Sequence, residues 1–378
     1  MVSPRSDEIL PVLKASVHDV RQFTSLLRGV NFANRATVTV TERGLVVAVE
    51  EARTLLGTAY IFSDVFDEYQ YHSESQEEEQ QEEQDVYNSA FEIQLNTLIE
   101  CLNIFGTAGG SGSSGSGKHV QWKQSNEEQG SSDDEDRNDG GHGAEGKRRN
   151  KKGAQGGNTS LDLFFSKSER KTSMRMTYLG NGFPLTLLIA EDSSGPTTTC
   201  EIATFEAEPQ LELPFDPDDM KLKVILKSSW LKEALSEIDS SCDKLTFIGN
   251  PPEQAHAERV SGREKERGRT RTKPILRIQA TSMHGTTEME YFNDRDVLET
   301  FECAGPGPVS FSYRFVHITR AMRALQTSIK TSLRIDKEGL LSLQFLMPVS
   351  GSRRNDTGGG SSSNFIEFRC LALDEETS

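Results

Sequence analysis

The stretch LRIDKEGLLSLQF at residues 333–345 has the pattern of a β-hairpin. Apolar and polar residues alternate on both arms, and Gly339 lies in the turn between them. This alternation is typical of half-buried strands, and glycine accepts the positive φ of a tight turn. TVTVTERGLVVAVE (37–50) and MRMTYLGNGFPLTLLI (174–189) follow the same plan. The chain therefore contains a repeated hairpin module.

The composition indicates a folded protein interrupted by polar insertions. Only 34% of the 378 residues are hydrophobic, and the mean hydropathy is −0.55. The polar excess is local and falls in four low-complexity stretches, 72–86, 107–160, 250–274 and 350–363. The net charge of −16 argues against a generally basic nucleic-acid binder. Much of this charge lies in the insertions, so the folded parts have to be considered separately.

The cysteines and the hydropathy predict an intracellular protein with no membrane segment. Five widely spaced cysteines form no CxxC pair, and no signal peptide precedes them. The longest apolar runs are well short of the ~18 residues of a membrane span. We expect reduced, buried thiols.

Each hairpin is preceded by a strand and a helical stripe. The four expected helices cover 16–30 with Ser16 as N-cap, 96–106 with Asn96 as N-cap, 228–239 and 317–327. The repeated order predicts an α+β protein of two similar domains, each built from two βαβββ units. The expected domains are 8–204 and 221–374, joined by a Pro-rich, acidic connector at 205–220.

Motifs for chemistry are weak. GSGSSGSGKH (110–119) resembles a phosphate loop, but its lysine is followed by His119, and its low-complexity flanks favour an accident of composition. Two acidic triplets are the nearest approach to a two-metal site, and we interpret them as solvated acids: Asp64, Asp67 and Glu68, and Asp216, Asp218 and Asp219. We predict no catalytic residue, no metal site and no cofactor. The basic stretch KRRNKK (147–152) fits a nuclear-localisation patch or a plain linker equally well.

Three of the four expected helices carry cations, whereas the second has only Glu100 and Asn103 as notable polar residues. The candidate phosphate-facing residues are Arg21, Arg28, Lys232, Arg320 and Arg323. On charge alone, a solvated polar face is the simpler interpretation.

Several segments resemble the PCNA-like DNA sliding-clamp superfamily, and within it the Rad-one family of subunits of the heterotrimeric 9-1-1 checkpoint clamp. The segments that carry the resemblance are VNFANRATVTVTERGLVVAVEEARTLLGTAYIF, FEIQLNTLIECLNIFG, MTYLGNGFPLTLLI, LKEALSEID and SLRIDKEGLLSLQF. They run from about 12 to 373, and the insertions between them depart from the compact family pattern.

The resemblance implies a nuclear ring of three different subunits, with helices lining a central hole and sheets outside. It also implies loading onto damaged DNA by a clamp loader of the Rad-seventeen/RFC type, followed by checkpoint signalling and recruitment of repair factors. Double-stranded DNA would be encircled without sequence specificity. Under this architecture Arg320 and Arg323 are the first DNA-facing candidates, followed by Arg21, Lys232 and Arg28.

In clamps, client peptides dock under the connector, where Leu211, Leu213 and Phe215 either form a pocket or anchor the connector itself. Members of the family have also been described as 3′→5′ exonucleases, which would require a metal-binding acid cluster. A third possibility is an interaction scaffold without DNA contact.

Overall fold

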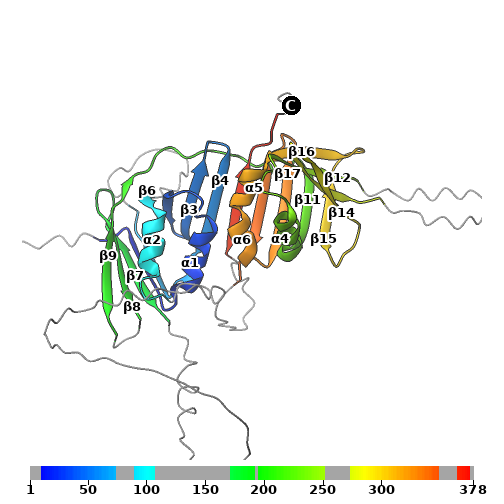
Figure 1. Cartoon of the computed structure of the whole chain (residues 1–378). Helices are drawn as coiled ribbons and strands as arrows, with labels where there is room; N and C mark the ends of the chain where they lie inside the picture. The colour runs from blue at the N-terminus through cyan, green and yellow to red at the C-terminus, as the bar shows by residue number, and fades with distance from the viewer. Residues whose placement is uncertain are drawn as a thin grey trace, which may run out of the picture. The chain divides into compact units, whose positions relative to one another are not determined.

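The computed structural model describes residues 10–73, 89–106, 171–191, 195–251, 273–348 and 364–374. Within these residues the chain forms three antiparallel sheets and a row of short helices (Figure 1). The Gly-rich motif at 110–119, the basic stretch 147–152 and most of the four insertions lie outside the described residues.

The elements of the first half are β1 (Leu13–Val17), α1 (Val20–Gly29), β2 (Arg35–Thr41), β3 (Gly44–Glu51), β4 (Leu55–Phe62), the 3₁₀ turn η1 (Ser63–Val65), β5 (Glu68–Tyr71), β6 (Ser89–Gln94), α2 (Leu95–Leu102), β7 (Ser173–Tyr178), β8 (Leu185–Ala190), β9 (Thr197–Ile202) and β10 (Phe205–Glu206).

The elements of the second half are β11 (Met220–Lys227), α4 (Ser228–Glu237), β12 (Lys244–Gly249), β13 (Leu276–Ser282), β14 (Gly285–Tyr291), β15 (Leu298–Cys303), β16 (Val309–Arg314), α5 (Phe315–Arg320), α6 (Met322–Thr327), β17 (Lys330–Asp336), β18 (Leu341–Leu346) and β19 (Phe365–Cys370).

The order strand, helix, three strands occurs four times in the described residues, with β5, β10 and β15 as additional strands. This confirms the predicted α+β repeat. One ten-stranded sheet, in the order β10-β6-β2-β3-β4-β19-β18-β17-β11-β15, contains strands of both halves. The smaller sheets are β5-β1-β7-β8-β9 and β14-β13-β12-β16. Because one sheet runs through both halves, the predicted domain boundaries at 204 and 221 stay a prediction.

The hairpin at 333–345 has the expected geometry. Leu333 pairs with Leu343 across β17 and β18, and Gly339 adopts φ +83° in the turn. The hydroxyl of the fully buried Tyr313 donates to the carbonyl of Gly339 over 2.8 Å. The turn is therefore tied to β16 in the neighbouring four-stranded sheet.

The predicted helix boundaries need three corrections. Ser16 lies within β1, and α1 is capped instead by Asp19, whose carboxylate accepts from the Arg21 backbone N–H over 3.1 Å. Asn96 lies inside α2, which begins at Leu95. The fourth predicted helix is broken at Ala321 into α5 and α6. Ser16 and Asp19 are both residue types that cap helices, so local sequence did not decide between them, whereas α2, α5 and α6 begin without a side-chain cap bond.

The two halves meet where β4 pairs with β19 and α1 crosses behind them. Gly29 of α1 lies against Ile366 and Ala324, where an added Cβ would come within 2.2 Å of the Ile366 side chain. The Phe32 and Phe368 rings pack against Gly57 of β4, with centroids 5.7 Å apart. A larger residue at position 29 would force the end of the Ile366 side chain to move, because the helix approaches the sheet closely.

Candidate nucleic-acid interface

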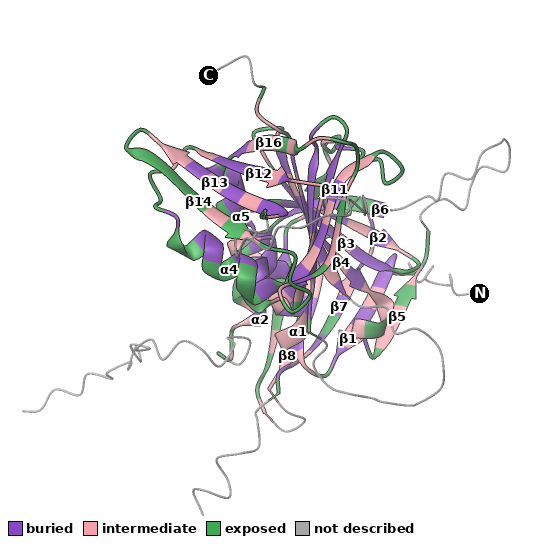
Figure 2. Cartoon of the chain, turned by 90° about the vertical axis from the view of Figure 1, so that its right-hand side faces the viewer, coloured by how far each residue is buried: buried purple, intermediate pink, exposed green. Residues whose placement is uncertain are grey.

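The helices form one continuous row on the ten-stranded sheet and its neighbours. α1 packs against α2 and α6, and α6 packs against α4, so the row runs α2-α1-α6-α4 across both halves (Figure 1). Each helix buries one side and exposes the other, as α4 shows in Figure 2. The predicted cations of α1, α4, α5 and α6 all belong to this row.

The α1 cations are partly engaged within the chain. Arg21 forms an ion pair with Asp19, with its Nη2 2.7 Å from the Asp19 Oδ2. Burial acts to raise the pKa of Asp19, but hydrogen bonds from Arg21 outweigh it and lower the pKa below its usual value. Partial burial of Arg28 lowers the pKa of its guanidinium, which still stays charged at neutral pH. α1 therefore offers less free positive charge than its sequence indicates.

The two leading candidates, Arg320 and Arg323, contact the other half of the chain. Arg320 makes a two-point ion pair with Glu51 of β3, with Nε–Oε2 and Nη2–Oε1 distances of 2.9 and 3.0 Å. Arg323 donates from Nη1 to the backbone carbonyl of Asn31 over 3.0 Å. The carboxylate neutralises Arg320, whereas the neutral carbonyl leaves the charge of Arg323 uncompensated.

The outer helices of the row differ in charge. Lys232 on α4 is exposed and forms no ion pair with another described residue. α2 exposes Asn96 and Glu100 and contains no lysine or arginine. The positive charge of the row therefore lies mainly on its α6 and α4 side, at Arg323 and Lys232.

The connector is tethered along the outer face of the ten-stranded sheet. The backbone N–H of Glu208 donates to Glu92 over 3.0 Å, and that of Leu211 donates to Glu50 over 3.1 Å. Further along, Arg369 donates to the Leu213 carbonyl over 2.8 Å. The bonding residues lie on β6, β3 and β19, in that order along the sheet, so the connector crosses the sheet from its β6 side towards β19.

A buried carboxylate organises the far end of this path. Glu367 accepts from Arg334 and Arg369 over 3.1 and 2.9 Å and from Ser342 over 2.6 Å. The Arg334 guanidinium lies 4.8 Å from the centroid of the Phe215 ring. Charge-assisted hydrogen bonds of this kind are the strong ones, and a buried charge needs them. This network holds the connector in place.

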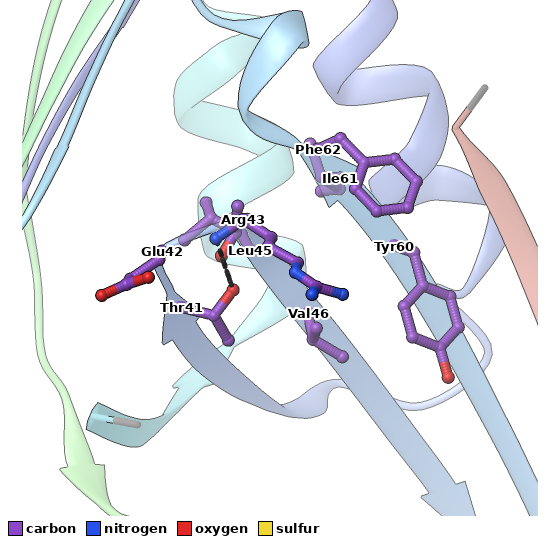
Figure 3. Close-up of a pocket in the computed structure, with 9 residues that line it drawn as sticks. Thr41, Glu42, Arg43, Leu45, Val46, Tyr60, Ile61 and Phe62 are labelled. Carbon is purple, nitrogen blue, oxygen red and sulfur yellow. Dashed lines mark hydrogen bonds between the residues drawn. The ribbon is translucent and has the colours of Figure 1, made fainter. Parts of the chain in front are cut away.

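The three predicted connector residues lie along this path. Leu213 is buried, and Leu211 and Phe215 are half-buried. An open apolar pocket lies elsewhere on the same sheet, at the β2–β3 turn and the end of β4. It measures about 520 Å³, and Val46, Tyr60 and Phe62 contribute apolar side chains to its lining (Figure 3).

The sequence analysis did not identify this pocket. A signal was present, since β4 is apolar on both faces at its end, with Tyr60 and Phe62 alternating with the buried Ala59 and Ile61. A strand with one face in water usually alternates apolar with polar residues.

The acidic triplets are not assembled for metal binding. Asp67 accepts from the backbone N–H of His18 over 2.7 Å, and Glu68 pairs with Lys14 over 2.8 Å. Asp64 lies in η1, and partial burial raises the pKa of its carboxyl. In the connector, Asp219 pairs with Lys337 over 2.6 Å. The described part of the chain contains no group of three or more His, Cys, Asp or Glu residues placed to hold a metal ion.

None of the described helices has the length and apolarity needed to cross a bilayer.

A family model described as "Repair protein Rad1/Rec1/Rad17" matches residues 12–347. "DNA repair exonuclease REC1" of Mycosarcoma maydis is 28% identical, covering 97% of each chain. "Cell cycle checkpoint protein RAD1" of Mus musculus is 27% identical over 96% of this chain and 93% of its own.

The fold also matches a solved clamp structure. The crystal structure of Proliferating Cellular Nuclear Antigen from Entamoeba histolytica superposes with a TM-score of 0.55 at 10% identity, covering 97% of this chain and all of that one. At this identity the match shows the fold alone, and that fold is the predicted PCNA-like clamp fold.

Proposed function

The chain belongs to the Rad1/Rec1/Rad17 family of repair proteins, and from this premise we propose that it is one subunit of a heterotrimeric ring clamp. The ring encircles double-stranded DNA without sequence specificity, is placed there by a clamp loader of the Rad-seventeen/RFC type, and signals DNA damage in the nucleus. Two other clamp subunits complete it.

The observation that carries the proposal is the row of helices that crosses both halves of the chain on one continuous sheet. A surface of this kind can line a hole, and topological retention leaves its cations only the task of screening phosphates. Arg323 and Lys232 fit that task best, since no carboxylate neutralises them among the described residues. Arg28 is next, and the paired Arg21 and Arg320 contribute less.

Ring closure is supported by two open sheet edges. β9 ends the five-stranded sheet and β14 ends the four-stranded sheet, and most residues of β14 are exposed (Figure 2). Two exposed aromatic residues, Phe183 and Phe292, lie beside these edges. The Phe183 carbonyl accepts a hydrogen bond from the hydroxyl of Thr204, which follows β9, and Phe292 comes directly after β14. An open edge is normally covered, and pairing with a neighbouring subunit would do this.

Ring assembly is tested by measuring the mass of the full chain with two candidate partner chains. We expect a 1:1:1 complex. Phe183→Glu and Phe292→Glu each break a different contact and should leave two-chain complexes, whereas Leu371→Glu, an exposed control away from both edges, should leave the ring intact. A monomer or a homotrimer in every mixture would overturn the proposal.

Client peptides are the second part of the proposal. The connector residues Leu211, Leu213 and Phe215 hold the connector, and an apolar client side chain enters the pocket beside Tyr60. Val46→Glu should abolish client binding and leave ring assembly intact. Equal client binding by the Val46→Glu variant would contradict this assignment.

An exonuclease activity is the alternative, because the Mycosarcoma maydis relative is named as one. We propose a non-catalytic clamp, since Asp67 and Glu68 are committed to separate partners. A nuclease assay with Mg²⁺ decides between them. Degradation by the purified chain that is lost in Asp64→Ala and Asp67→Ala variants would establish the enzyme.

A further inference from the structure

Two cysteines far apart in the sequence lie where α2 packs against β9. Cys101 belongs to α2 and Cys200 to β9, and the helix packs against that strand (Figure 1). Both side chains are half-buried against the core. On β9, Thr199 and Glu201 are exposed and Ile202 is buried, so Cys200 shares the inward side of the strand with Ile202.

The two thiols lie close enough to interact with each other. Burial first, and then the interaction with Cys200, raise the pKa of Cys101 to about 11, and the nearby Glu100 carboxylate acts in the same direction. Cys101 therefore keeps its proton at neutral pH. This leaves Cys200 as the nucleophile of the pair.

We propose that Cys101 and Cys200 are a redox pair that a hydroperoxide converts into an intramolecular disulfide linking α2 to β9. The Cys200 thiolate attacks the peroxide, the O–O bond breaks, and a sulfenic acid forms as water or an alcohol leaves. The Cys101 sulfur then attacks the Cys200 sulfur, the S–O bond breaks and water leaves. The two thiols lose two electrons and two protons, and the peroxide is reduced.

The other thiols have different surroundings. Cys303 lies 3.6 Å from the Gly249 carbonyl, and the buried Cys370 lies 3.6 Å from the Nδ1 of His317. Within the described residues, Cys101 and Cys200 are the thiols placed beside each other. This inference is independent of the proposed ring, because it needs only the fold of the first half.

The test treats the full chain with hydrogen peroxide and measures intact mass and cross-linked peptides without reductant. We expect loss of two hydrogen atoms, a Cys101–Cys200 peptide pair, and full reversal by a dithiol reductant. Cys101→Ser and Cys200→Ser should each prevent the cross-link. Cys242→Ser, which removes a half-buried thiol of the other half, should leave it unchanged.

A circular-dichroism spectrum of each variant distinguishes a lost bond from a lost fold. The proposal is overturned if the folded wild-type chain keeps both thiols after treatment, or if Cys200 pairs with a different cysteine. It is also overturned if Cys101→Ser, correctly folded, still loses two hydrogen atoms.

Discussion

The row contains two helix pairs, α1 with α2 in the first half and α4 with α6 in the second. The two pairs differ in how far neighbouring carboxylates neutralise their cations. In the first half, Arg21 is neutralised by Asp19 two residues away, and α2 carries only the acidic Glu100. In the second half, Lys232 and Arg323 face no carboxylate partner among the described residues, although Arg320 is neutralised by Glu51. The presence of a cation on the exposed face of a helix therefore does not by itself make that cation available to a phosphate. The nearest carboxylate decides whether that cation is available to a phosphate.

The largest expected effect comes from reversing the charge of the second pair. Lys232→Glu with Arg323→Glu should weaken association of the assembled clamp with duplex DNA by roughly tenfold or more, because each lost phosphate contact also removes counterion release. The salt dependence of binding should fall with it. Binding is measured by fluorescence anisotropy across a salt series.

Arg21→Glu is the matched control from the first pair, and we expect a smaller loss because Arg21 is already paired. Equal losses in the two cases would remove the distinction between the helix pairs. If neither variant changes loading, the chain is a scaffold without DNA contact.

A smaller effect follows from breaking the ion pair that joins the halves. Glu51→Gln should lower the free energy of unfolding by about 0.5–1 kcal/mol, a range that allows for solvent screening of this partly exposed pair. It also releases the charge of Arg320, so DNA association should become tighter. Urea denaturation and anisotropy measure the two changes. Weaker DNA binding would mean that Arg320 needs Glu51 to hold its position.

A turn of the first half stores a modest strain. Ala52 and Arg53 adopt φ of 53° and 52° between β3 and β4, a region that favours glycine. Ala52→Gly should raise the free energy of unfolding by about 0.5 kcal/mol, since relief of the strain exceeds the added chain entropy. Ala48→Gly, inside β3, is the control and should lower it. A loss of stability in both variants would contradict this account.

The smallest effect is a pH dependence of the free energy of unfolding, caused by His317 in the second half. Burial lowers the pKa of His317, with Glu51 opposing the shift and Arg314 and Arg320 adding to it. The unfolded chain binds this proton more readily, so stability is present above pH 6.5 and is lost as the pH falls through the lower folded pKa. Urea denaturation at about pH 7.5 and about pH 5.5 should show this loss. The same loss in His317→Gln would assign it to another group.

Local pattern predicted the repeated fold well and the partners of the candidate residues poorly. The hairpin around Gly339 was readable because alternation and a turn glycine occur within a few residues. Arg320 and Glu51 are 269 residues apart, and no local signal links them. The pocket at Tyr60 depends on how the β2–β3 turn lies against the end of β4, which the pattern of a single strand does not show. Helix caps were partly predictable. Ser16 and Asp19 are both suitable N-caps for α1, and packing selects Asp19.

The joint between β4 and β19 also constrains how the chain folds. Beside it, the Phe62 N–H donates to the Asn364 side chain across 302 residues, so the last described strand completes a sheet begun near the start. Contacts of this range form late, after each half has acquired its local hairpins. Until then β4 presents an open edge that β19 of a second molecule can fill equally well. Refolding at high concentration should therefore produce dimers that have exchanged this strand, in competition with correctly closed monomers.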